Sequence, residues 1–212
     1  MCSGRVDIEF ILRAFANGND GVFIGGCRLN ECNYVTQGNY DALGNVLLCR
    51  KIMKHIGLDP ERLRIEFMNA SDGIFLAETI NDFRAKVNAL GPIGKGEGLD
   101  KKGLDRKLEA ARKLVPYLRL VERERLRAPV KSPDAYRKHF ASAEVDRLFQ
   151  DLVLDKLAVG EISLLLREKP LSTSEIAEAL GLTPSEVAKH LGVSSKHGLV
   201  RYDQERKRYA VA

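Results

Sequence analysis

The stretch Val22-Phe23-Ile24-Gly25-Gly26-Cys27-Arg28-Leu29-Asn30-Glu31-Cys32-Asn33-Tyr34 is a short apolar run that ends in two glycines and continues into a segment with two cysteines. The run follows the turn signal Asp20-Gly21 and predicts a strand buried on both faces of a parallel sheet. Ligands gather where parallel strands end at their carboxyl side, so we expect Cys27 at that edge of the sheet.

The two cysteines of this stretch are separated by four residues. This spacing opens the plant-type ferredoxin pattern, in which thiolates hold an iron–sulfur cluster. Gly25 and Gly26 lack a Cβ and would let the backbone approach a bulky group closely. The spacing is equally compatible with two reduced thiols in a packed loop.

The first ninety residues alternate helix and strand signals. Apolar periodicity, caps and glycine stops predict helices over 6–18, 40–57 and 74–90, and alternating apolar and charged residues predict a strand over 63–68. These elements form a βαβ unit, so we predict an α/β domain that has a short parallel sheet with flanking helices.

Two further cysteines lie in predicted helical surroundings. Cys2 precedes the first helix beside Arg5, a setting that favours the thiolate that ligates metal. The alternative is a frayed terminal cysteine without a role. Cys49 lies inside the second helix between apolar residues, and we interpret it as a small buried hydrophobe rather than a ligand.

Length and composition indicate the class of protein. The chain has 212 residues, which suits two small domains, and no stretch approaches the roughly twenty apolar residues of a membrane span. No signal peptide is visible, so we expect a cytoplasmic protein without a membrane anchor. Three of the four cysteines fall within the first 32 residues, a distribution that indicates metal or redox chemistry rather than a disulfide scaffold.

The basic excess is confined to the middle of the chain. Residues 95–140 carry a net charge of +7, whereas residues 1–94 and 141–212 each carry −1. The glycine-rich stretch 93–98 predicts a flexible linker, and the apolar spacing after it predicts a helix through Arg127. Its polar side bears seven cations: Arg106, Lys107, Arg112, Lys113, Arg119, Arg123 and Arg125. This side is either solvated or docks to an acidic surface of a partner protein or a phosphate backbone.

The N-terminal motifs resemble a known family. The chain opens with Met1-Cys2-Ser3-Gly4-Arg5-Val6, continues with Gly26-Cys27 and a second cysteine five residues on, and then has a Tyr and Gly38-Asn39. Together these motifs make residues 1–92 similar to the iron–sulfur delta subunit of methyl-viologen-reducing (F420-non-reducing) hydrogenase. The resemblance implies a 2Fe-2S cluster with Cys2, Cys27 and Cys32 on family cysteines. It also implies electron transfer from hydrogenase subunits to the flavin-bearing subunit of heterodisulfide reductase.

The chain departs from the family pattern at two points. The family normally has another strand and a Cys-x-x-Cys-type loop before the Met-Cys-Ser-Gly-Arg motif, and it usually has His where this chain has Asn33. A 2Fe-2S cluster takes four ligands, and the matching cysteines number three. The fourth ligand comes from a partner or from sequence ahead of Met1, or the cluster has been lost.

The last seventy residues follow a different pattern. Two capping boxes, one beginning at Ser172 and one at Thr183, open short helices joined across Gly181-Leu182, which predicts a helix-turn-helix. Two short strands over 198–202 and 207–211 predict a β-hairpin wing. The order resembles a winged-helix domain of the kind found in arsenic-repressor-like regulators.

A DNA-binding winged helix would present its second helix to a groove. This helix offers Lys189, His190, Ser194, Ser195 and Lys196, and the wing offers Arg206, Lys207 and Arg208 to phosphates. The net charge of −1 opposes this role, because DNA binders usually carry a basic footprint. Winged helices also dock proteins, and we place DNA second. We interpret His190 and His197 as surface histidines rather than metal ligands.

The sequence therefore predicts three parts: an iron–sulfur domain over 1–93, a linker with a basic connector helix over 94–140, and an α+β winged-helix domain over 141–212. The first functional hypothesis is a non-catalytic electron-transfer subunit of an oxidoreductase complex. The second is a redox- or metal-responsive transcriptional regulator, and the third is an apo scaffold with a decayed cluster site.

Overall fold

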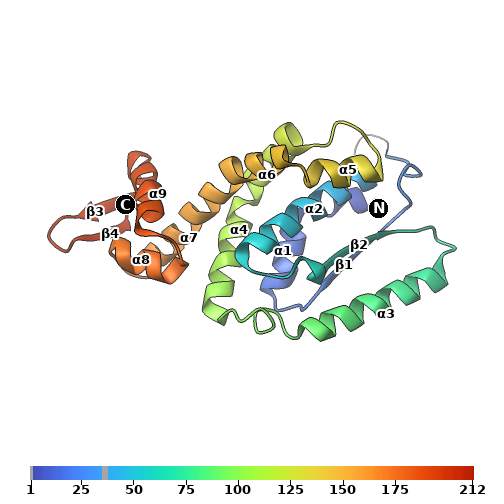
Figure 1. The fold of residues 1–212 in the computed structure, drawn as a ribbon, viewed down its shortest axis with the longest axis horizontal. Coiled ribbons are helices and arrows are strands. Elements are labelled where there is room, and N and C mark those ends of the chain that lie inside the picture. Colours follow the sequence, from blue (N-terminus) through green and yellow to red (C-terminus); the bar gives the residue numbers. More distant parts are fainter. Residues whose placement is uncertain (1, 35–37) are drawn as a thin grey trace. The chain divides into compact units, whose positions relative to one another are not determined.

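The computed structural model describes residues 2–34 and 38–212, which form two compact units, Met1–Leu148 and Phe149–Ala212 (Figure 1). Met1 of the N-terminal motif lies outside the described residues. The predicted connector region 94–140 falls inside the first unit.

The first unit contains a two-stranded sheet, short 3-10 and π-helical segments, and six α-helices within the described range. Its elements are η1 (Ser3–Arg5), α1 (Ile8–Ala16), β1 (Val22–Gly26), α2 (Asn39–Ile56), η2 (Pro60–Arg62), β2 (Leu63–Phe67), α3 (Gly73–Leu90), α4 (Lys101–Val121), η3 (Glu122–Leu126), α5 (Pro133–Phe140) and α6 (Ala143–Phe149), the last of which ends at the first residue of the second unit. The predicted α/β class with a short parallel sheet is confirmed.

The sheet pairs β1 with β2 in parallel, with Val22 opposite Leu63 and Gly26 opposite Phe67. Ile24 is buried, but Val22 and Phe23 are half-buried and Gly25 is exposed. The prediction that this strand is buried on both faces is therefore wrong. One physical reason is that the carboxyl end of the strand, at Gly25 and Gly26, lines an open cavity.

Helices cover the two faces of the sheet unequally (Figure 1). On one side lie α1 and α2, whose apolar faces form the main core; α2 ends at Gly57, which adopts the left-handed conformation (φ 87°) that glycine favours. On the other side lies α3, which buries Thr79, Phe83 and Val87. The ring of Phe83 packs 5.8 Å from the ring of Phe23 on β1.

Arg62 is completely buried at the start of β2. Its Nε lies 2.5 Å from Glu97 Oε1, and its Nη2 lies 3.1 Å from Glu97 Oε2. The guanidinium also donates to the backbone oxygens of Asp20, Leu90 and Gly91. Stretch 93–98, predicted to be a flexible linker, is instead a series of turns held to the first unit, because Glu97 is the counter-ion of a buried cation.

The basic helix α4 packs onto its own unit. The helix and its apolar side were predicted, and that side is buried against α1 and α2. On its polar side, Arg112 Nη2 lies 3.3 Å from Glu9 Oε1 and Arg119 Nε lies 2.7 Å from Asp7 Oδ2. Two of the seven cations therefore pair with the acidic first turn of α1. These pairs are half-exposed, so each contributes at most about 1 kcal/mol.

Helix α5 was not predicted from the sequence. Ser132 caps this helix by accepting from the Ala135 backbone N–H at 3.1 Å, and Pro133 takes the first helical position. Both are recognised helix-start signals. Tyr136 is buried, and its ring centre lies 5.0 Å from that of Tyr40 on α2. This contact packs α5 against α2.

The second unit is a winged helix, as predicted. Its elements are η4 (Gln150–Leu154), α7 (Asp155–Glu168), α8 (Thr173–Leu180), α9 (Pro184–Lys196), β3 (Val200–Asp203) and β4 (Arg208–Val211). Both capping boxes are present, and the two strands form an antiparallel hairpin. The unit has its own apolar core, built around Ile162, Ile176 and Val187.

None of the described helices combines the length and the apolar composition that a membrane crossing would require.

Replacing Arg62 with Met tests the buried ion pair. We expect Arg62→Met to lower the free energy of unfolding of the first unit by about 3–5 kcal/mol, because Glu97 and three carbonyl oxygens lose their partner. Denaturant unfolding followed by circular dichroism measures this. Arg64→Met is the matched control, because Arg64 pairs with Glu66 and Asp82 near the surface; a loss equal to that of Arg62→Met would contradict the assignment.

The same pair predicts a dependence of stability on pH. Burial alone would raise the pKa of Glu97, but the hydrogen bonds and charge of Arg62 lower it below its usual 4.5. A carboxylate with a lowered pKa stabilises the fold above its ordinary pKa, and that contribution is lost as pH falls through the folded value. We expect wild type to lose stability below about pH 4.5, and Glu97→Gln to lose less over the same range.

Candidate metal centre

The carboxyl ends of β1 and β2 open into a cavity of about 590 Å³, here called the thiol hollow. Its walls come from η1, from the segment that follows β1, and from the start of α3. Three of the four cysteines line it: Cys2, Cys27 and Cys32. The structure therefore brings together the three predicted ligand residues.

Cys2 and Cys32 are in direct contact. Their Sγ atoms are 3.5 Å apart, although the residues are thirty positions apart in the chain. Cys2 is held as the N-terminal cap of η1, where its Sγ accepts the Gly4 backbone N–H at 3.4 Å. The separation exceeds the S–S length of about 2.05 Å in a disulfide, so both are free thiols.

Asn39, the buried first residue of α2, fixes the position of Cys27. Its Nδ2 donates to the backbone oxygens of Cys27 at 2.9 Å and Arg28 at 2.7 Å, and it lies 3.7 Å from Cys27 Sγ. The Cys27 side chain is exposed. The amide thus fixes the backbone while leaving the sulfur accessible from the hollow.

The surroundings shift the pKa values of the Cys27 and Cys32 thiols in opposite directions. Hydrogen bonds from the backbone N–H groups of Tyr34 and Asn39 lower the pKa of Cys32, against a smaller effect of burial. Partial burial and the neighbouring Cys32 thiol raise the pKa of Cys27. Cys32 is therefore the better anion of the two, and it lies at the N-terminus of an 18-residue helix, where a negative charge is stabilised.

Two glycines are required for the hollow. A Cβ on Gly38 would lie 2.7 Å from Cys32 Sγ, and a Cβ on Gly26 would lie 2.8 Å from Ser3 Oγ. Real Cβ atoms do not approach other atoms so closely, so any side chain at either position would displace the wall of the hollow. Gly25, by contrast, has open space around it.

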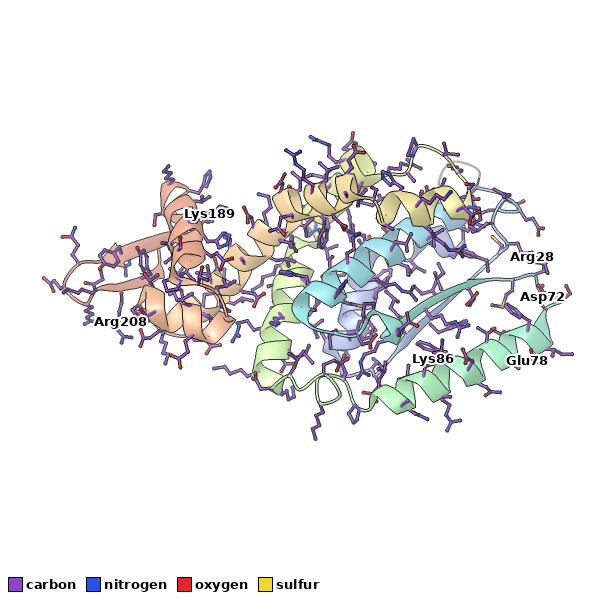
Figure 2. All side chains as sticks on the ribbon, viewed as in Figure 1. Arg28, Asp72, Glu78, Lys86, Lys189 and Arg208 are labelled. Carbon is purple, nitrogen blue, oxygen red and sulfur yellow. The ribbon has the colours of Figure 1, made fainter. Side chains whose placement is uncertain are left out.

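An ion pair that includes the lining residue Asp72 lies beside the hollow. Arg28 Nη2 lies 2.8 Å from Asp72 Oδ2, and the same oxygen accepts the Asn69 backbone N–H at 2.9 Å. Figure 2 shows these two side chains beside each other at the ends of the strands. The contact links the segment after β1 to the segment after β2.

The side chains at the hollow that could bind a metal-containing group are mainly thiols. Within 2–34 and 38–212, no set of three or more His, Cys, Asp and Glu side chains is arranged to hold a single metal ion. The hollow nevertheless presents three thiols, and its wall contains a buried hydroxyl, Ser3 Oγ, that has no hydrogen-bond partner. Soft sulfur donors select iron–sulfur clusters, zinc and copper(I).

Cys49 is separate from this site. It is completely buried within α2, and burial raises the pKa of its thiol to about 12. The predicted packing role of Cys49 is confirmed.

The exposed surface of α9 differs from the predicted recognition surface. His190 and Ser194 are buried, and Ser194 Oγ donates to the His190 backbone oxygen at 2.8 Å. Both point into the core because they share the helix face of Val187 and Leu191, so the predicted groove contacts of His190 and Ser194, and the surface position of His190, are wrong. Lys189, labelled in Figure 2, is exposed, and its Nζ lies 3.0 Å from Asp155 Oδ2.

Three residues of the site were not predicted from the sequence: Ser3, Gly38 and Asn39 as structural partners of the thiols. Ser3 and the pair Gly38-Asn39 stand inside the motifs that carry the family resemblance, and that position was the available signal. Gly38 and Asn39 contact residues six to twelve positions earlier, and Ser3 lies against Gly26, so no pattern of neighbouring residues could reveal these contacts.

Comparison with known proteins identifies two regions of the chain. Residues 160–202 match the family described as "Bacterial regulatory protein, arsR family". Residues 1–91 match the family described as "Methyl-viologen-reducing hydrogenase, delta subunit".

Three relatives resemble the first region. The chain is 46% identical over 92 residues to an iron-sulfur subunit of the F420-non-reducing hydrogenase of Archaeoglobus profundus, covering 43% of this chain and 66% of the relative. It is 40% identical over 101 residues to an iron-sulfur subunit of the F420-non-reducing hydrogenase vhc of Methanococcus voltae, covering 48% and 69%. It is 45% identical over 94 residues to a subunit of the ferredoxin/F(420)H(2)-dependent CoB-CoM heterodisulfide reductase of Methanosarcina acetivorans, covering 44% and 12%.

The matched region thus spans just under two thirds of the Archaeoglobus relative and about one eighth of the Methanosarcina relative. The matching motifs and the thiol hollow fall in the same residues, and on this similarity the chain belongs to the methyl-viologen-reducing hydrogenase delta subunit family.

Proposed function

We propose that the first unit holds a 2Fe-2S cluster on Cys2, Cys27 and Cys32 and serves as a non-catalytic electron-transfer subunit. The observation that carries this proposal is the convergence of the three thiols on one hollow. Two of the relatives are named iron-sulfur subunits, which supports the same cofactor. A bound cluster would accept and release one electron at a time.

The three cysteines and Asn39 each have a role in this proposal. Cys2 and Cys32 are spaced for one metal ion, since two thiolates with 2.3 Å bonds in a tetrahedral site are about 3.8 Å apart and these sulfurs are 3.5 Å apart. Cys27 supplies a third thiolate, and Asn39 holds its backbone. The fourth ligand position is left for a group from a partner chain or from sequence ahead of Met1, because Cys49 is buried elsewhere.

We further propose hydrogenase or other dehydrogenase subunits as electron donors and the flavin-bearing subunit of a heterodisulfide reductase as acceptor. Support comes from the relatives, since one is named as part of a hydrogenase and another as part of a heterodisulfide reductase.

Anaerobic reconstitution with iron and sulfide tests the cluster. With a small thiol added as the fourth ligand, we expect wild type to gain visible absorption and, after reduction, an electron paramagnetic resonance signal. Cys27→Ser should lose most of both, whereas Cys49→Ser should match wild type because its sulfur does not reach the hollow. The proposal fails if wild type binds no cluster, and the ligand assignment fails if Cys49→Ser loses it.

The same samples test the relay. The reduced, reconstituted chain should reduce the flavin of a purified heterodisulfide reductase flavin subunit, and Cys27→Ser should not. Flavin reduction at equal rates by both proteins would exclude a relay through this site.

A substitution at Gly38 tests the shape of the hollow. We expect Gly38→Ala to reduce the iron bound per chain at least several-fold, because the new methyl group would displace Cys32 Sγ. Gly73→Ala is the matched control, since Gly73 also lines the hollow and has open space where a Cβ would stand. Equal iron content in the two variants would contradict the proposed packing.

The second candidate function is DNA binding by the second unit, as in a redox- or metal-responsive regulator. It is favoured by the arsR-family match over residues 160–202 and by the β-hairpin wing. Against it, α9 contains no Arg, Asn or Gln to read bases, its Lys189 pairs with Asp155, and residues 149–212 carry nine basic and nine acidic residues.

A gel-shift titration with DNA at several salt concentrations decides this second role. Binding through phosphates should weaken steeply as salt rises, and the double substitution Arg206→Glu and Lys207→Glu on the wing should abolish it. We expect no such salt-dependent shift from a protein-docking unit. A shift that is weak and independent of salt would therefore exclude the regulator.

A further inference from the structure

Ser3 presents an unusual hydroxyl in the wall of the thiol hollow. Its Oγ is buried from solvent and has no hydrogen-bond partner among the described residues. A buried hydroxyl without a partner is destabilising, so natural structures seldom retain one without a reason. The other described side-chain atoms without such a bond are Nε atoms of two α4 arginines that interact through other atoms, and these residues do not line the hollow.

The surrounding backbone holds this hydroxyl in place. Ser3 lies in η1 directly after Cys2, and its backbone oxygen accepts the Val6 N–H at 2.8 Å. Gly26 at the end of β1 leaves the space that the hydroxyl occupies, because a Cβ there would lie 2.8 Å from Ser3 Oγ. The position is therefore built by two segments and is not the result of a loose side chain.

Two other polar groups near the thiols already have partners. The Asn39 amide donates to two backbone oxygens, and the Asp72 carboxylate binds Arg28 and the Asn69 N–H. The hydroxyl of Ser3 can donate a hydrogen bond as well as accept one. The three cysteine sulfurs that line the hollow are possible acceptors.

We propose that the Ser3 hydroxyl donates a hydrogen bond to a sulfur of the cluster and its thiolates, and that this bond raises the reduction potential of the site. The inference rests on the proposed function and adds a residue that tunes it. Hydrogen bonds to the sulfurs are one of the factors that set the potential of iron–sulfur clusters. Such a bond stabilises the more negative, reduced state, so removing it lowers the potential.

The first test uses the reconstituted chain. Ser3→Ala should bind as much iron and sulfide per chain as wild type, and a redox titration should give a more negative potential. Electron–nuclear double resonance in heavy water should detect an exchangeable deuteron near the reduced cluster that Ser3→Ala lacks. Ser185→Ala, which removes an exposed hydroxyl from α9, is the control and should leave both readouts unchanged.

A second test uses the cluster-free chain. There the hydroxyl has no partner to lose, so the melting temperature of Ser3→Ala should equal or exceed that of wild type. A merely structural serine would instead give a lower melting temperature.

The outcomes separate the two proposals. Wild type without a cluster would refute the proposed function and this inference with it. A loaded Ser3→Ala with wild-type potential, or with less than half of the wild-type iron, would overturn the tuning role alone. A lower melting temperature in the cluster-free variant would also overturn it.

Discussion

The buried guanidinium of Arg62 is the interaction on which the first unit depends. A charge without solvent is tolerated because every side of this group has a partner: the Glu97 carboxylate and the backbone oxygens of Asp20, Leu90 and Gly91. These partners belong to the turn before β1, the end of α3 and the turns before α4. The Arg62 side chain therefore joins the amino-terminal ends of β1 and β2 to the end of α3 and to the turns before α4. The thiol hollow opens at the opposite, carboxyl ends of the same two strands.

Local signals predicted much of the fold. The capping boxes at Ser172 and Thr183 and the left-handed Gly57 mark helix ends by chemistry within a few residues, and the structure has those ends. The role of Glu97 could not be predicted, because its partner Arg62 is thirty-five positions earlier and neither residue stands in a distinctive motif. The incomplete burial of β1 depends on the open cavity at its carboxyl end, which the apolar run does not encode.

The same distinction applies to the candidate site. The spacing of Cys27 and Cys32 located the hollow, and the apolar surroundings of Cys49 excluded that residue from it. The partners of Asn39 became visible only in three dimensions, since its amide reaches back to the segment after β1. On α9, His190 was misplaced because polar character was given more weight than helical position: His190 lies three residues after Val187, on the buried face.

The pairing of β1 with β2 also has a consequence for the order of events during synthesis. All three thiols of the hollow lie within the first 32 residues, whereas the wall formed by Met68 and Asn69 is translated more than thirty residues later. On a chain that emerges from its N-terminus, the cysteines reach the outside of the ribosome before the strand that completes their enclosure. Until that strand is in place, the three thiols would be open to solvent and to oxidation.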